Sequence, residues 1–170
     1  TVTITVNGSV RIVGDANHRI TFSGVPNLPL KADPADPGLP LTTPKWGGLW
    51  LQNSNDPNNV ISYVDFIDAQ DVLSGSNGTS RGCIYLKESA CTIDHCTFRG
   101  THLHMIYGDH CSFTIQYCDF PNVFSATESP GGLDNVAEPI KMINFFLPGG
   151  QAIIRWNTFR GNKGHNDVID

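Results

Sequence analysis

Four six-residue segments of this chain follow one pattern: ISYVDF at 61–66, IDHCTF at 93–98, IQYCDF at 115–120 and IRWNTF at 154–159. Each segment begins with Ile, ends with Phe and carries Val, Cys or Asn at its fourth place. A repeat of this kind indicates a stack of similar coils, because one such unit is too small to bury its own apolar side chains.

A second short segment accompanies the repeat, as GLWL, CIYL, MIYG, PIKM and DVID. Its matching apolar positions are Leu49, Ile84, Ile106, Ile140 and Val168. The shortest interval, from Ile84 to Ile106, sets the length of a minimal coil. The longer intervals carry loop insertions near 68–80 and 125–137. The proline-rich segment 25–45 is predicted to be an external loop, since proline cannot donate a hydrogen bond to a sheet.

These intervals predict an all-β chain that forms a right-handed parallel β-helix, a solenoid of one domain. Residues 1–24 are expected to form its first coils, and residues 46–170 the coils that follow. Neighbouring coils would lie about 4.8 Å apart, the spacing of hydrogen-bonded strands. Equivalent residues would then form columns: an interior column of the four Ile residues, another of the four Phe residues, and Val64, Cys96, Cys118 and Asn157 at the bend between them.

The repeat resembles the right-handed parallel β-helix repeat family, the pectate-lyase-like superfamily, in its bacterial secreted or cell-surface form. The resemblance covers roughly residues 45–170, and Asn157 stands at a bend where that family commonly has Asn. It implies the fold and an extracellular or cell-surface location. It implies little about activity, since this fold hosts lyases, hydrolases, adhesins and inert stalks.

Composition excludes some classes of partner. The formal net charge is −5, which argues against nucleic acid because phosphate binding needs a basic face. No apolar run approaches the ~20 residues of a membrane span. The chain opens with TVTITV and closes with DVID, both strand-like. We therefore expect a neighbouring subunit, or the remainder of a longer chain, to cover the open ends of the β-helix.

Five cysteines lie between residues 83 and 118, without the C-x-x-C spacing of zinc or redox sites. Cys96 and Cys118 occupy the same place in the repeat and are expected to stack in neighbouring coils. Buried thiols are one interpretation of the five, and a disulfide among them is another.

Two segments are similar to catalytic motifs of this fold. The stretch 93–96, IDHC, resembles part of the calcium-binding sequence of pectate lyases, but Thr92 replaces its Trp. On the structural alternative, His95 fills a column with Tyr63, Tyr117 and Trp156. Separately, Glu138, Lys141 and Arg155 loosely resemble the acid, base and arginine of alginate and chondroitin lyases. Simple strand alternation turns Lys141 and Arg155 outward.

Two binding sites are also predicted. Asn166, Asp167 and Asp170 offer oxygen ligands suited to calcium, although Asx turns would use the same residue types. An aromatic row could stack on sugars or pack within the protein, and its side is left open by the bend in the chain. The row consists of Trp46, Trp50, Tyr63, Tyr117 and Trp156.

Two functions remain. The first is a non-enzymatic structural or adhesive module of an extracellular protein, which assembles end to end or binds glycans. The second is a fragment of a polysaccharide lyase that abstracts a proton beside a uronate carboxylate and eliminates the leaving group.

Overall fold

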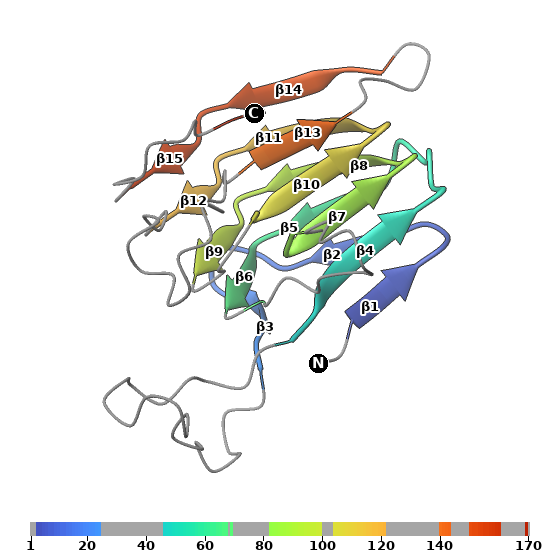
Figure 1. Cartoon of the computed structure of the whole chain (residues 1–170). Coiled ribbons are helices and arrows are strands. Elements are labelled where there is room, and N and C mark those ends of the chain that lie inside the picture. Colours follow the sequence, from blue (N-terminus) through green and yellow to red (C-terminus); the bar gives the residue numbers. More distant parts are fainter. Residues whose placement is uncertain are drawn as a thin grey trace, which may run out of the picture.

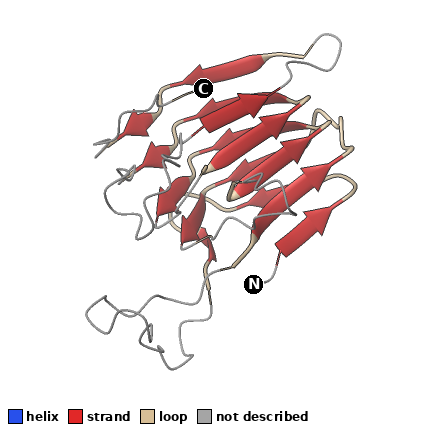
Figure 2. Cartoon of the chain, in the orientation of Figure 1, coloured by secondary structure: helices blue, strands red, loops and turns tan. Residues whose placement is uncertain are grey.

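The computed structural model describes residues 3–24, 46–67, 69, 82–99, 104–121, 140–143, 150–160 and 169. These residues form fifteen β-strands and no helix (Figure 2). The predicted loops 25–45 and 125–137 lie outside the described residues, as does 68–80 apart from Ala69, which forms an isolated bridge with Trp46.

The strands form three five-stranded parallel sheets, here called A, B and C, and each run of three strands adds one strand to each sheet. Figure 1 shows the strands of each sheet following one another from the N-terminal to the C-terminal end. Sheet A comprises β1 (Thr3–Val6), β4 (Gly48–Gln52), β7 (Ile84–Lys87), β10 (Ile106–Asp109) and β13 (Ile140–Ile143). Sheet B comprises β2 (Arg11–Val13), β5 (Val60–Ser62), β8 (Ala90–Asp94), β11 (Ser112–Gln116) and β14 (Ala152–Arg155). Sheet C comprises β3 (Ile20–Phe22), β6 (Val64–Ile67), β9 (Thr97–Arg99), β12 (Asp119–Phe120) and β15 (Thr158–Phe159). This arrangement is consistent with a parallel β-helix.

The interior of sheet B is the predicted isoleucine column. Ile61 pairs with Ile93, Ile93 with Ile115 and Ile115 with Ile154. The first three of these side chains are completely buried or nearly so. Each fully buried side chain of this size contributes roughly 1.5–3 kcal/mol of hydrophobic stabilisation. The register predicted from the repeat is confirmed.

The predicted phenylalanine column runs through sheet C as a set of stacked rings. The ring centroids of Phe66 and Phe98 lie 5.1 Å apart, those of Phe98 and Phe120 5.0 Å, and those of Phe120 and Phe159 4.7 Å. Phe22 of the first coil extends the column, 5.7 Å from Phe66. The core is therefore one continuous column of packed apolar side chains along the coils.

One predicted register is wrong by a single residue. In sheet A, Leu49, Ile84, Ile106 and Ile140 pair in turn, as expected. The next partner of Ile140 is Ile169 and not Val168. In a strand a shift of one residue exchanges the inward and outward sides, and interval lengths alone do not fix it across an insertion.

At the corners of the coils, asparagine side chains hydrogen-bond to the backbone of neighbouring coils. Asn59, 1% exposed, accepts a hydrogen bond from the Val10 backbone N–H and donates to the Ala90 carbonyl, so it links three successive coils. Asn157 likewise accepts from the Cys118 backbone N–H and donates to the Ile115 carbonyl. Buried backbone groups at a bend must be hydrogen-bonded, which explains asparagine at these positions.

Replacing Phe98 by Ala should lower the free energy of unfolding by about 3–5 kcal/mol, because it opens a cavity in the middle of the ring column. Arg99→Ala, at the exposed neighbouring position, should change it by less than about 0.5 kcal/mol. Denaturant titration of both variants measures the two effects. Equal effects would contradict a shared interior column.

Candidate functional site

Four aromatic side chains form a stack at the bend between sheets B and C, here called the bend ladder: Tyr63, His95, Tyr117 and Trp156. Their ring centroids are separated by 4.5, 4.8 and 4.9 Å in that order. The predicted column of His95 with these three residues is confirmed. Tyr117 and Trp156 are 45% and 60% exposed, so the ladder lies on the outside of the coils.

Each residue of the bend ladder has a left-handed backbone, with φ between 51° and 55°. Such a conformation costs a residue with a side chain roughly 1–2 kcal/mol. The same conformation recurs at the corner between sheets A and B, at Asn53, Glu88 and His110. The second, third and fourth coils therefore turn at both corners through a left-handed residue, and ring stacking offsets part of the cost at one of the two corners.

Within the bend ladder, His95 and Tyr117 each have two stacked neighbours, and Tyr63 and Trp156, at the ends, have one each. A sugar ring binds an aromatic side chain through an open face, whereas stacking at 4.5–4.9 Å leaves mainly ring edges to solvent. At the last ring, the Arg155 guanidinium lies over Trp156 at 4.3 Å. The geometry thus favours packing between coils as the role of Tyr63, Tyr117 and Trp156.

The predicted aromatic row includes two residues that the structure places elsewhere. Trp46 is buried in the core, where its ring contacts those of both Phe22 and Phe66, and donates its indole N–H to the Ile67 carbonyl. Trp50 lies on sheet A, with its ring edge-on to Tyr85. A single row of five aromatic residues is therefore incorrect, because the residues belong to three separate columns.

On sheet A, Trp50, Tyr85, Tyr107 and Lys141 occupy one register column. Tyr85 and Tyr107 are nearly buried, and the Tyr107 ring also contacts His104. Lys141 thus belongs to sheet A, whereas Arg155 belongs to sheet B. Strand alternation alone does not bring these two positions to one surface, and Glu138 lies outside the described residues.

Arg155 already has partners in its own sheet. Its Nε donates to Gln116 Oε1 at 2.9 Å, in addition to the contact with Trp156. The predicted calcium ligands Asn166, Asp167 and Asp170 lie outside the described residues. Within the described part of the chain, no group of three or more His, Cys, Asp or Glu is placed to hold a metal ion.

Arg19 forms a polar clamp across the first three coils that the sequence did not indicate. Its guanidinium donates to the Asp65 carboxylate at 2.8–3.0 Å, to the His95 carbonyl at 2.9 Å and to the Thr97 hydroxyl at 3.2 Å. The hydrogen bond from Arg19 lowers the pKa of Asp65, and the same bond raises the pKa of Arg19. The clamp also brings the guanidinium within 6.0 Å of the Tyr63 ring.

All five cysteines are buried as thiols and not as disulfides, which agrees with the interpretation of buried thiols. Burial raises the pKa of Cys91 and of Cys111 to about 12. Cys96 and Cys118 behave differently. The Cys96 thiol donates to the Ile61 and Asp94 carbonyls, and the Cys118 thiol to the Ile93 and Gln116 carbonyls. The proximity of the two thiols lowers the pKa of Cys96 and raises the pKa of Cys118. The predicted stacking of these two residues is therefore present.

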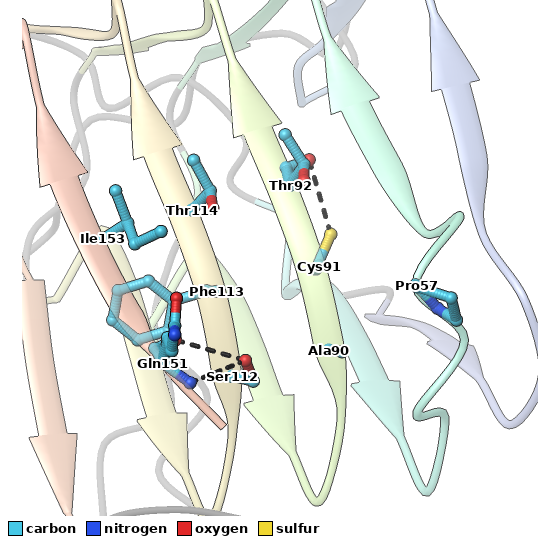
Figure 3. A pocket seen from close by; sticks show the side chains of 9 residues that line it. All are labelled: Pro57, Ala90, Cys91, Thr92, Ser112, Phe113, Thr114, Gln151 and Ile153. Atoms are coloured by element: carbon cyan, nitrogen blue, oxygen red, sulfur yellow. Dashed lines mark hydrogen bonds between the residues drawn. The ribbon is translucent and has the colours of Figure 1, made fainter. Parts of the chain in front are cut away.

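A shallow groove of about 260 Å³ runs along the coils beside sheet B (Figure 3). Thr92, Thr114 and Ile153 lie along it, and Ser112 and Gln151 are joined within it by hydrogen bonds of 3.0 and 3.2 Å. None of the residues that line it is charged. The groove therefore provides no cation for a uronate carboxylate and no acid or base for catalysis.

Comparisons with protein-family models, with curated proteins and with solved structures found no match to this chain. No helix that could cross a bilayer occurs among the described residues.

At Tyr117, substitution by glycine should destabilise the protein less than substitution by alanine, which is the reverse of the usual order. At a left-handed position glycine avoids the steric cost of Cβ, so Tyr117→Gly should be more stable than Tyr117→Ala by about 1 kcal/mol. The same pair of substitutions at Thr114, within β11, should favour alanine. Thermal and denaturant unfolding of the four variants measures this. A more stable alanine variant at Tyr117 would contradict the described bend.

Asp65→Asn should lower the free energy of unfolding by about 1–2 kcal/mol at neutral pH, because a charge-assisted pair with Arg19 is lost. The pKa of Asp65 is lowered in the folded protein. The stabilisation of the fold by ionised Asp65 is therefore complete at pH values above its unfolded-state pKa of about 3.9. It is lost as the pH falls through its folded-state pKa. The wild type and the variant should converge at acidic pH in denaturant titrations.

Arg19→Gln provides the matched test of that pair. In an Arg19→Gln background, Asp65→Asn should lose most of its effect at neutral pH, because the partner is already absent. An undiminished effect would show that Asp65 stabilises the coils through other groups.

Proposed function

We propose that this chain is a non-enzymatic, right-handed parallel β-helical module of an extracellular or cell-surface protein, built like members of the pectate-lyase-like superfamily. Its role is structural or adhesive: a rigid stack of coils that joins a neighbouring subunit, or further coils of a parent chain, at its open ends. Right-handedness is supported by the strong preference of connections between parallel strands of one sheet for that hand.

The observation that carries the proposal is the open first coil. Ile4 occupies the same register column as Leu49 and Ile84. Those two side chains are 2% and 0% exposed, whereas Ile4 is 40% exposed. The apolar side chain at this position is thus buried in the following coils but exposed to solvent in the first coil. A further coil stacked on the first would bury the Ile4 side chain.

The strands of that first coil support the same conclusion. Among the described residues, β1, β2 and β3 each pair with a strand on one side only. An unpaired strand edge is a template for another strand, and proteins normally cover or charge such an edge. These three strands, TITV, RIV and ITF, carry one charged residue, Arg11, and the apolar Val13 on β2 is 47% exposed, so this edge carries little protection against pairing.

The polysaccharide lyase remains the alternative. Its support is the shared column of Lys141 with the aromatic residues Trp50, Tyr85 and Tyr107 on sheet A. The separate sheet of Arg155, and its existing contacts with Gln116 and Trp156, weigh against it. Release of unsaturated products from alginate, pectate or chondroitin, followed by ultraviolet absorbance, would favour the lyase and overturn the non-enzymatic role.

Light scattering of the purified chain should show a mass that rises with concentration, as coils pair end to end. Ile4→Lys should weaken this association by about tenfold or more, because pairing would bury an unpaired charge. Thr5→Lys is the matched control, since Thr5 is also exposed but lies on the opposite side of β1. A molecular mass equal to that of the monomer at every concentration would contradict assembly through this end.

A further inference from the structure

Two of the five buried thiols lie directly over one another in neighbouring coils. The pairs Asp94 with Gln116 and Thr97 with Asp119 flank them in register. The Cys96 carbonyl accepts a hydrogen bond from the Asp119 N–H at 2.9 Å. Cys96 and Cys118 therefore stand at the same height of their coils, at the bend that follows the bend ladder.

The spacing of neighbouring coils suits a covalent bond between these residues. Hydrogen-bonded parallel strands lie about 4.8 Å apart, and disulfides join cysteines whose Cα atoms are about 4.4–6.8 Å apart. The rings one residue earlier, His95 and Tyr117, stack at 4.8 Å, in keeping with that spacing. Both side chains are buried, 1% and 2% exposed, and they occupy matching positions in neighbouring coils.

Each of the other three cysteines has residues other than cysteine as its register neighbours. In the register of the sheets, Cys91 stands beside Phe113, Cys83 stands between Gly48 and Met105, and Cys111 stands beside Ser89. All five cysteines belong to the described part of the chain, so Cys96 and Cys118 are its one pair of cysteines in register. Val64 holds the equivalent position one coil earlier and shows that an apolar side chain also fits there.

We infer that Cys96 and Cys118 form a disulfide when the chain folds in an oxidising environment, and that this bond joins the third coil to the fourth. The oxidant is a small-molecule disulfide such as oxidised glutathione. The Cys96 thiolate attacks one of its sulfurs and releases a glutathione thiolate. Cys118 loses its proton, attacks the mixed disulfide at Cys96 and releases the second glutathione. The two protein sulfurs lose two protons and two electrons, and the glutathione disulfide becomes two thiols.

The inference rests on the proposed extracellular location only for the oxidising environment, because disulfides persist in oxidising compartments. The chemistry can be tested without that location. A bond between coils closes a loop of the chain and restricts the unfolded state. The oxidised protein should therefore have an unfolding equilibrium constant roughly a hundredfold smaller than the reduced protein.

The test refolds the full chain in buffer with reduced and oxidised glutathione, alkylates the free thiols and maps the peptides by mass spectrometry. We expect one bridge, Cys96 to Cys118, with Cys83, Cys91 and Cys111 alkylated and the intact mass lower by two hydrogen atoms. Five alkylated cysteines, or a bridge between any other pair, would overturn the inference. Neither result would bear on the end-to-end assembly, which light scattering measures separately.

Variants separate the bond from its surroundings. Cys118→Val and Cys96→Val keep an apolar side chain like that of Val64 and should abolish both the bridge and the gain in stability upon oxidation. Cys91→Ala, which removes another buried thiol, should retain both. Circular dichroism confirms that each variant has folded. A gain in stability upon oxidation that persists in Cys118→Val would contradict a bond at this position.

Discussion

The parallel, in-register pairing of each coil with the next is the constraint on which every other feature of this protein depends. It places like residues over like, so one isoleucine or phenylalanine per coil becomes a buried column. It also stacks the polar and aromatic residues of the bends, including the bend ladder and Asn157. The stability of such a stack is largely a sum of contacts between neighbouring coils, so a fault in register in one coil would affect several columns at once.

The register between coils could be predicted from the sequence at some positions and not at others. The columns of Ile61 and Phe66 followed from the repeat because the two residues keep a constant separation within a coil. The first coil did not follow the repeat, since its Ile12 and Phe22 are ten positions apart instead of five, yet they pair with Ile61 and Phe66. The partner of Ile140 was predicted one residue too early, at Val168 instead of Ile169, for the same reason: the number of residues between the two strands differs from that of the minimal coil.

The candidate site was less predictable because its residues stand at bends. Strand alternation stops at a left-handed residue, so the side on which Tyr117 and Trp156 lie could not be read from the pattern. The residues Trp46 and Trp50, only four apart, end in different surroundings because one enters the ring column of sheet C and the other lies on sheet A. Nothing in the sequence joins Arg19 to Asp65, which lie 46 residues apart and meet only when the coils stack.

The reach of Arg19 has a mechanical consequence. In a stack held together by nearest neighbours alone, the outermost coil could detach first and leave the remainder intact. Arg19 starts in the first coil, binds Asp65 in the second and donates to the His95 carbonyl and the Thr97 hydroxyl in the third. A force that detaches the first coil must therefore break its contacts with two coils together, so the first step of peeling needs more work than the pairing of adjacent coils alone would require.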